Sequence, residues 1–487
     1  MGIVAKQSIY NIISIGFAFL IGAVNMLFLY PTFPGKEFQG LIVALLANSN
    51  LIQPFISFGV QHTLIKYFSD SKSKEERDRL LWFSLFLPLV ILLFSFPFYH
   101  YFNLEILNFL SNGNQGVARF PFLIVTVAIA TAYFEVFFSW VRVHLKSVFG
   151  NFLKEVYPRF LTFVLLLAYA LRWIDLDLFI SLLIGGYYLR LIIIMIYSFL
   201  VYFPSFQFKL PLAWKSMLRY SSLIFLSGAA ASFILDIDKS MIYSLTTEAN
   251  VAFYAVALYI AAVIEAPGRA MFQITSPLVA QALNTNDANR LERLLKKSSI
   301  NLIIVATILF LVINLNLNDF YQLINQDGYS SAIGVVIIVS VGKLFSMSMG
   351  CLNNIISNSK YYSYVFWFSV SSAILAVVLN YYFIKSFGIM GAAFATLTVL
   401  LFINTCKIIL VYLLYKIHPY SIKTLGVVVC GAFIFTIISL IPSVGSPWLS
   451  IPLRSILILG LFSIALVVFR WSEDVEEVFT KIKKRLF

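Results

Sequence analysis

The chain is a series of long apolar runs, and this pattern more than any other feature limits what it can fold into. Each run has about 20 to 30 residues, enough for one α-helix to cross roughly 30 Å of hydrocarbon with some tilt. Transmembrane strands would have about ten residues with strict alternation of apolar and polar side chains, and the runs show neither property. The sequence therefore predicts an all-α polytopic membrane protein.

Fourteen runs can be distinguished, and the fifth is the weakest because Lys154, Glu155 and Arg159 occupy its first half. The predicted spans are residues 8–30, 39–67, 80–102, 119–146, 149–171, 178–203, 215–246, 250–283, 298–323, 330–357, 361–384, 388–416, 420–441 and 450–470. Of all 487 residues, 60% are hydrophobic and only 12% are charged. No loop between the spans is long enough to fold as a domain of its own.

The basic residues are distributed unequally between the two ends of the spans. If Met1 is cytoplasmic, 26 of the 35 Lys and Arg residues fall in cytoplasmic loops or helix ends, five fall outside and four lie in mid-span. This bias follows the positive-inside rule, so we expect both termini in the cytoplasm. It also explains the net charge of +13, for which anionic membrane lipids are the expected partner and a nucleic acid is not needed.

Eight ionisable residues lie in the middle of predicted spans. A charge at that depth costs at least about 2.5–3.5 kcal/mol, so it usually faces a polar interior and marks a substrate or ion path. The candidates for binding an anionic substrate are Arg190, Lys239, Arg269 and Lys343. The candidates for ion coupling or for structural charge pairing are Glu135, Asp236, Asp238 and Glu265.

Helical spacing leaves a structural role open for some of these charges. Asp236 and Lys239 are separated by three residues, and Glu265 and Arg269 by four, so each pair lies on one helix face and can neutralise itself. Asp238 lies about 100° around the helix from Lys239, which leaves its partner undetermined.

Arg190 and Lys343 have no acidic residue within one helical turn in sequence, and this favours a functional role for both. Each needs a partner from another helix, from water or from an anionic ligand. Glu135 is the acidic counterpart, for which proton coupling and a salt bridge to Arg190 or Lys343 are equally open.

A weak internal repeat relates the second and eighth spans. Aligned with an offset of 213, they place Pro54 opposite Pro267, and a helix start follows each span, with Ser73 and Glu76 at capping-box spacing and Asp287 as a cap. Pro-interrupted helices in matching positions of two halves indicate a transporter with its site between them. We therefore consider both prolines as gating residues, although a proline more often only bends a helix.

The repeat predicts four parts: a six-helix lobe over 1–214, a second over 215–418, two added helices over 419–471, and a cytoplasmic amphipathic tail over 472–487. Three cysteines in apolar spans and four scattered histidines give neither a disulfide framework nor metal-ligand spacing. We expect no metal, no cofactor and no catalytic residue.

Two segments resemble a known group of transporters. Residues 219–283, beginning RYSSLIFLSGAAASFILDIDKS, resemble the seventh and eighth helices of polysaccharide flippases of the multidrug/oligosaccharidyl-lipid/polysaccharide exporter superfamily. Residues 342–401 look like helices ten to twelve, and the sharpest motif is the GIMGAAFAT segment within NYYFIKSFGIMGAAFAT. The motif is shared across the superfamily, so it supports the fold more than the substrate.

The resemblance implies a protein of the bacterial inner membrane, with two six-helix lobes around a central cavity that opens alternately to each side. The implied cargo is an undecaprenyl-diphosphate-linked oligosaccharide, flipped to the outer leaflet for O-antigen, capsule or exopolysaccharide synthesis. Basic cavity residues would hold the diphosphate, and a polysaccharide polymerase and chain-length machinery are the implied protein partners. Coupling to protons, to sodium or to the membrane potential stays open.

Two other function classes compete with a flippase. In a cation- or proton-coupled drug antiporter of the same superfamily, Asp236, Asp238 and Glu265 would form the centre, but fourteen spans and two locally unpaired bases weigh against it. A membrane glycosyltransferase or polymerase would need an extramembrane domain, which the short loops do not provide. The chain is therefore expected not to be an enzyme.

Overall fold

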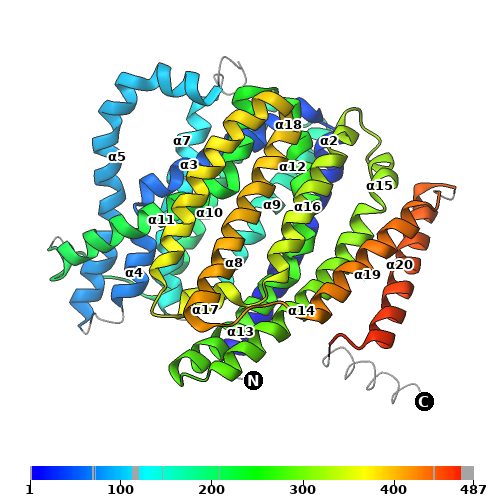
Figure 1. The fold of residues 1–487 in the computed structure, drawn as a ribbon. Helices are drawn as coiled ribbons and strands as arrows, with labels where there is room; N and C mark the ends of the chain where they lie inside the picture. The colour runs from blue at the N-terminus through cyan, green and yellow to red at the C-terminus, as the bar shows by residue number, and fades with distance from the viewer. Residues whose placement is uncertain are drawn as a thin grey trace. The chain divides into compact units, whose positions relative to one another are not determined.

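The computed structural model describes residues 3–68, 71, 73–111, 120–144, 146–207, 209–442 and 445–472. Across these residues the chain is helical and contains no strand (Figure 1). The chain forms two compact units, Met1–Ala255 and Val256–Phe487, and the boundary falls inside helix α12 (Glu248–Ala262). The predicted all-α polytopic architecture is confirmed, while the predicted amphipathic tail lies outside the described residues apart from Ser472.

Unit 1 contains the helices up to the first half of α12. They are α1 (Ile3–Val24), α2 (Tyr30–Thr32), α3 (Gly35–Ser57), α4 (Val60–Phe68), α5 (Lys74–Ser111), α7 (Pro121–Val143), α8 (Ser147–Glu155), α9 (Tyr157–Ala170), α10 (Leu176–Val201) and α11 (Trp214–Leu245). A five-residue π-helix, η1 (Asn25–Leu29), joins α1 to α2. Helix α3 packs against α7 and α11, and α7 also packs against α10.

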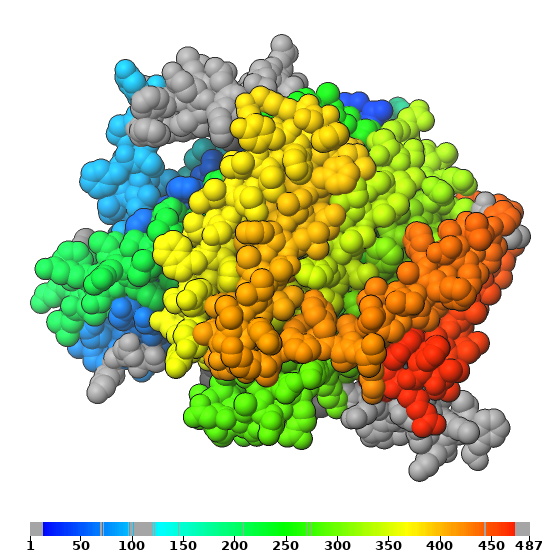
Figure 2. All heavy atoms as spheres, viewed as in Figure 1, coloured from blue at the N-terminus to red at the C-terminus, as the bar shows by residue number. Residues whose placement is uncertain are grey.

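Unit 2 contains the remaining helices. They are α13 (Ala266–Asn284), α14 (Ala288–Asn314), α15 (Leu317–Ile324), α16 (Ile333–Ser348), α17 (Leu352–Asn358), α18 (Ser363–Tyr415), α19 (Ile422–Ser439) and α20 (Pro447–Phe469). Two 3-10 turns, η2 (Val263–Glu265) and η3 (Tyr329–Ala332), precede α13 and α16. Figure 2 shows α19 and α20, coloured orange to red, side by side, and both share a buried core with α14.

Twelve of the described helices are long and apolar enough to cross a membrane, which makes this a multi-pass membrane protein. The sequence predicts fourteen spans, two more than the structure, and the difference arises in two regions. Helix α18 holds the eleventh and twelfth predicted spans in one element, and the fifth predicted span is divided into α8 and α9.

The division of the fifth span has a local cause. Pro158, in the first turn of α9, has no backbone N–H to continue the hydrogen-bond ladder of α8. The three charges of this segment all have partners: Lys154 pairs with Glu135 at 2.7 Å, and Arg159 pairs with Glu155 at 3.2 Å. The charges that make the fifth predicted span the weakest are therefore neutralised by ion pairs within unit 1.

The GIMGAAFAT segment forms the turn between the two halves of α18. Gly388 has φ 57° and ψ −135°, a backbone conformation that a side chain would disfavour, and the helix runs back after it (Figure 1). A Cβ on Gly391 would lie 1.9 Å from the carbonyl oxygen of Phe383, so only glycine permits this close approach. The turn therefore requires glycine at two positions of the motif that carries the resemblance.

The second predicted span also breaks. Helix α3 ends at Ser57, Phe58 and Gly59 both have positive φ, and α4 begins at Val60. A Cβ on Gly59 would lie 2.8 Å from the backbone oxygen of Ser221 in α11, so the break brings this turn against the neighbouring helix. The predicted helix starts are confirmed where they are described: Ser73 accepts from the N–H of Glu76, and Asp287 accepts from that of Arg290.

Candidate functional site

The first group of charges lies between α3 and α11 in unit 1. Lys239 Nζ lies 2.5 Å from Asp236 Oδ1, so the predicted ion pair at i,i+3 is confirmed. Asn50 of α3 donates its side-chain amide to the other oxygen of Asp236 at 3.1 Å. Asp236 is therefore held from two helices, and it fixes the charge of Lys239 against α11.

Asp238 lies beside this pair but faces a different set of groups. Its side chain is only 5% exposed, and it accepts from the hydroxyl of Tyr254 at 2.6 Å and from the backbone N–H of Lys239 at 2.8 Å. Ser240 donates to the side chain of Asn48 at 2.5 Å, while the amide nitrogen of Asn48 is buried without a hydrogen bond. Asp238 is thus a buried carboxylate held by neutral donors.

Arg190 on α10 is a buried cation that forms no ion pair among the described residues. Only 4% of it is exposed, and its guanidinium lies 4.3 Å from the ring centroid of Phe134 and 4.7 Å from that of Tyr187. It donates one hydrogen bond, to Thr131 at 3.2 Å, and its Nε has no partner. Aromatic faces and one hydroxyl replace the carboxylate that a buried arginine usually has.

Glu135 does not form the salt bridge to Arg190 that the sequence leaves open beside proton coupling. Its carboxylate lies 2.7 Å from Lys154 Nζ on α8. Lys154 lies in the first half of the fifth predicted span and is not among the mid-span bases considered for Glu135, so this partner is missed. The break between α8 and α9 brings Lys154 against α7 instead.

In unit 2, Glu265 pairs with Lys343 of α16, and the two side chains are a quarter to a third exposed. The nearer candidate in sequence is Arg269, four residues along the chain. Glu265 lies in η2, a 3-10 turn, so the straight helix that the i,i+4 spacing assumes is absent at this point. Lys343, which has no acid nearby in sequence, obtains its partner from a different element.

Arg269 on α13 is left exposed by this arrangement. Within the described part of the chain it has no ion-pair partner, since the one carboxylate near it in sequence is taken by Lys343. Helix α13 is held in place by Asn354 of α17, whose amide donates to the backbone oxygen of Phe272 and to Thr275, each at 2.9 Å. The helix that carries the free guanidinium is therefore firmly positioned.

The two repeated prolines lie at helix breaks of different geometry. Pro54 is inside α3, four residues before Phe58, whose N–H bonds back to the Pro54 oxygen at 2.9 Å. Pro267 is in the first turn of α13, directly after η2. The breaks are therefore displaced relative to the aligned prolines, and a gating role for Pro54 and Pro267 stays a prediction.

Sequence reasoning missed three polar residues of the unit 1 group, Asn48, Asn50 and Tyr254. The two asparagines were detectable as an Asn-Ser-Asn interruption in an apolar span, whereas nothing in the sequence distinguishes Tyr254 from the many other tyrosines. Among the described residues, no three His, Cys, Asp or Glu side chains come together as a metal site.

Comparison with solved structures shows which fold this arrangement has. The chain is similar to a structure of the lipid II flippase MurJ in an inward closed conformation, with a TM-score of 0.73, 14% identity, and coverage of 96% of this chain and 99% of that one. It is also similar to an inward-facing multidrug resistance MATE family transporter of the MOP superfamily, with a TM-score of 0.58, 14% identity, and coverage of 84% and 96%.

A third similar structure is that of the MATE multidrug transporter DinF-BH, at a TM-score of 0.54 and 13% identity, with coverage of 84% and 95%. No protein-family description and no curated protein matches the sequence. All three structures are matched over more than nine-tenths of their own length, so the likeness extends over the whole architecture. The chain therefore has the fold of these flippase and transporter structures, in agreement with the all-α polytopic architecture that its sequence predicts.

Proposed function

We propose that this protein is a transporter that flips an undecaprenyl-diphosphate-linked oligosaccharide from the cytoplasmic to the outer leaflet by alternating access, for surface polysaccharide synthesis. The observation that carries the proposal is the exposed Arg269 on α13, which lacks an ion-pair partner among the described residues. In this role Arg269 is the first cationic contact of the diphosphate.

The cost of such a charge supports the proposal. An arginine in mid-span costs at least about 2.5–3.5 kcal/mol unless water, a counterion or a ligand solvates it. Protein groups reduce that cost for the other three bases. Lys239 pairs with Asp236, and Lys343 pairs with Glu265. Arg190 lies against two aromatic rings and donates to Thr131. Arg269 is the member of the set for which a ligand phosphate supplies the largest gain.

The other bases take supporting roles. Lys343 can exchange the carboxylate of Glu265 for a phosphate oxygen, because both groups are anionic. Its side chain is also partly exposed, so a ligand can reach it. Lys239 is held more tightly, by Asp236 and by the backbone oxygen of Leu235 at 3.0 Å. Arg190 is buried in this conformation and would reach a ligand only after movement of α7 or α10.

The structural likeness supports a lipid-linked cargo, since the TM-score to the lipid II flippase structure, 0.73, exceeds those to the MATE transporter structures, 0.58 and 0.54. A cation-coupled drug antiporter is the second candidate, with Asp238 as its proton-binding group. In that role Asp236 and Glu265 would also need to be available, yet each already pairs with a lysine. The pairing of two of the three acids favours the flippase.

The test is export of surface polysaccharide in a bacterial strain whose own flippase gene is deleted and which carries this protein. Arg269→Ala should abolish export and leave lipid-linked repeat units on the cytoplasmic face. Arg269→Lys should retain part of the activity, because lysine binds phosphate as a point charge but loses the bidentate geometry. Lys360→Ala, which removes an exposed base outside the spans, should export normally.

Normal surface polysaccharide in the Arg269→Ala strain, at an unchanged protein level, would remove Arg269 from the mechanism. Drug resistance on overexpression, with no polysaccharide defect on deletion, would favour the antiporter instead.

A further inference from the structure

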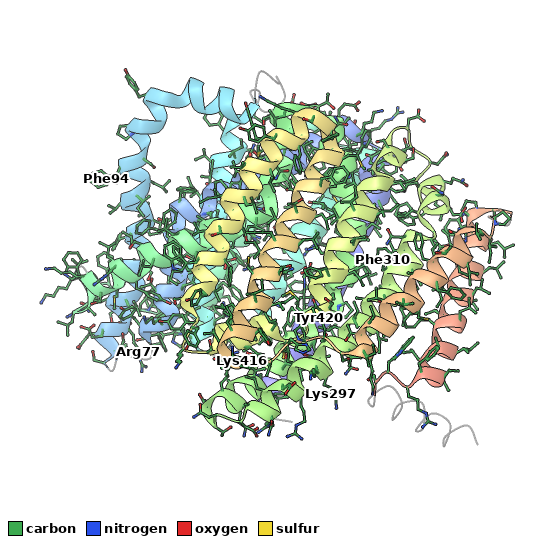
Figure 3. The ribbon with its side chains drawn as sticks, in the orientation of Figure 1. Arg77, Phe94, Lys297, Phe310, Lys416 and Tyr420 are labelled. Atoms are coloured by element: carbon green, nitrogen blue, oxygen red, sulfur yellow. The ribbon has the colours of Figure 1, made fainter. Side chains whose placement is uncertain are left out.

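A pocket of about 750 Å³ lies in unit 2 where the polar end of α14 meets the start of α19 and the end of α20. None of the mid-span charges described above lines it. Its wall holds four basic side chains, Arg293, Lys296, Lys297 and Lys423, together with the indole of Trp471. Figure 3 labels Lys297 at the lower end of α14.

The charge of this pocket is strongly positive. Among the described residues of its wall, Glu292 is the one acid, and it is already paired with Lys296 at 2.6 Å. Four bases against this one acid give the wall a net charge of +3, and Arg293, Lys297 and Lys423 are all exposed. An anionic ligand would therefore be attracted to the pocket.

The start of α19 adds to this preference. Ser421 caps the helix through a capping box with Thr424, and both Ser421 and the first-turn residue Lys423 line the pocket. The N-terminal end of a helix carries a partial positive charge and favours anions. The pocket thus combines side-chain and backbone positive potential.

The position of the pocket along the helices identifies the kind of anion. Its basic residues lie in the second and third turns of α14 and in the first turn of α19, while the following turns of both helices are apolar and pack together. Trp471 belongs both to this pocket and to an apolar groove of about 660 Å³ between α19 and α20. Tryptophan at such a polar–apolar junction is typical of the membrane interface.

We propose that this pocket binds the headgroup of an anionic phospholipid of the cytoplasmic leaflet. A basic pocket between transmembrane helices on the side richer in Lys and Arg is the usual form of such a site. The inference is independent of the proposed cargo, because it uses none of the residues assigned to flipping.

The test is native mass spectrometry of the purified full chain, titrated with phosphatidylglycerol and, separately, with phosphatidylcholine. One phosphatidylglycerol per chain should bind at least about tenfold more tightly than phosphatidylcholine, since each base near a membrane surface contributes about 1 kcal/mol. The variant Arg293→Gln, Lys297→Gln, Lys423→Gln should lose this preference. The control variant Lys209→Gln, Lys215→Gln, Arg219→Gln removes three bases from unit 1 and should keep it.

Because the three pocket substitutions are at exposed positions, the fold should survive, and a salt titration of the unmodified chain gives a second readout. Raising the salt concentration should weaken binding of phosphatidylglycerol and leave phosphatidylcholine unchanged. Equal binding of the two lipids, or equal loss in the control variant, would overturn the proposal. Full displacement of phosphatidylglycerol by inorganic phosphate or by undecaprenyl diphosphate would reassign the pocket to those ligands.

Discussion

Lys343 and Glu265 form an ion pair between α16 and the turn that precedes α13, although 78 residues separate them in sequence. This ion pair also determines whether Glu265 is available to Arg269. With Glu265 occupied by Lys343, Arg269 on the next turn of the chain has no ion-pair partner among the residues that the structure describes. This ion pair is the reason why Arg269, and not Lys343, is proposed as the first contact of the diphosphate.

The ion pair should show coupling between its two members. Lys343→Met leaves Glu265 without a counterion and should destabilise the protein by about 1–3 kcal/mol. The double variant Glu265→Gln, Lys343→Met should recover most of that loss. Thermal unfolding of the purified single and double variants measures the coupling, and additive losses would mean that the two residues act independently.

The turn inside α18 should tolerate no side chain at Gly391. Gly391→Ala places a Cβ against the Phe383 carbonyl, 1.9 Å away before any relaxation, and should greatly reduce the amount of folded protein in the membrane. Gly460→Ala is the matched control, because a Cβ there meets nothing within 4 Å. It should be neutral or stabilise α20 by up to about 1 kcal/mol. Equal yields of both variants would contradict the steric explanation.

Arg190 should affect stability and transport in opposite directions. Burying a charge that has no ionic partner is costly, so Arg190→Met, which fills a similar volume, should leave the melting temperature unchanged or raise it. If Arg190 reaches the diphosphate at a later step of the cycle, the same variant should reduce export. A variant that is less stable but exports normally would assign Arg190 a purely structural role beside Phe134 and Tyr187.

A diphosphate cargo should make flipping depend on the membrane potential. Moving two uncompensated negative charges outward is favoured by about 2.3 kcal/mol per charge per 100 mV when the cell interior is negative. A potential imposed across proteoliposomes should therefore accelerate outward flipping. Rates that do not change with the potential would mean that the protein's own positive charges move together with the phosphates.

The helical class and the position of most spans followed from the sequence because apolar run length is a direct consequence of bilayer thickness. The Asp236–Lys239 pair was predictable because its spacing fits a regular helix. The partners of Glu135 and Glu265 were not, since both depend on places where helices break, at Val156 and at η2. Contacts between distant helices, such as Tyr254 with Asp238, leave no trace in local periodicity.

GIMGAAFAT supports the fold because Gly388 and Gly391 build the turn of α18, so its residues report on backbone geometry and not on cargo. The substrate had to be inferred from charges, whose meaning changed once their partners were known. Arg269 became the stronger candidate for binding the diphosphate because it has no ion-pair partner among the described residues, whereas Lys343 pairs with Glu265.

The most direct test of the central claim is the rate at which purified, reconstituted protein flips an undecaprenyl-diphosphate-linked oligosaccharide across a vesicle membrane. The unmodified protein should flip the lipid faster than empty vesicles, and Arg269→Ala should be slower by about ten- to a hundredfold, the loss expected for one charged hydrogen bond. Lys360→Ala should match the unmodified protein. Flipping by Arg269→Ala at the unmodified rate would contradict the claim that this exposed guanidinium binds the diphosphate.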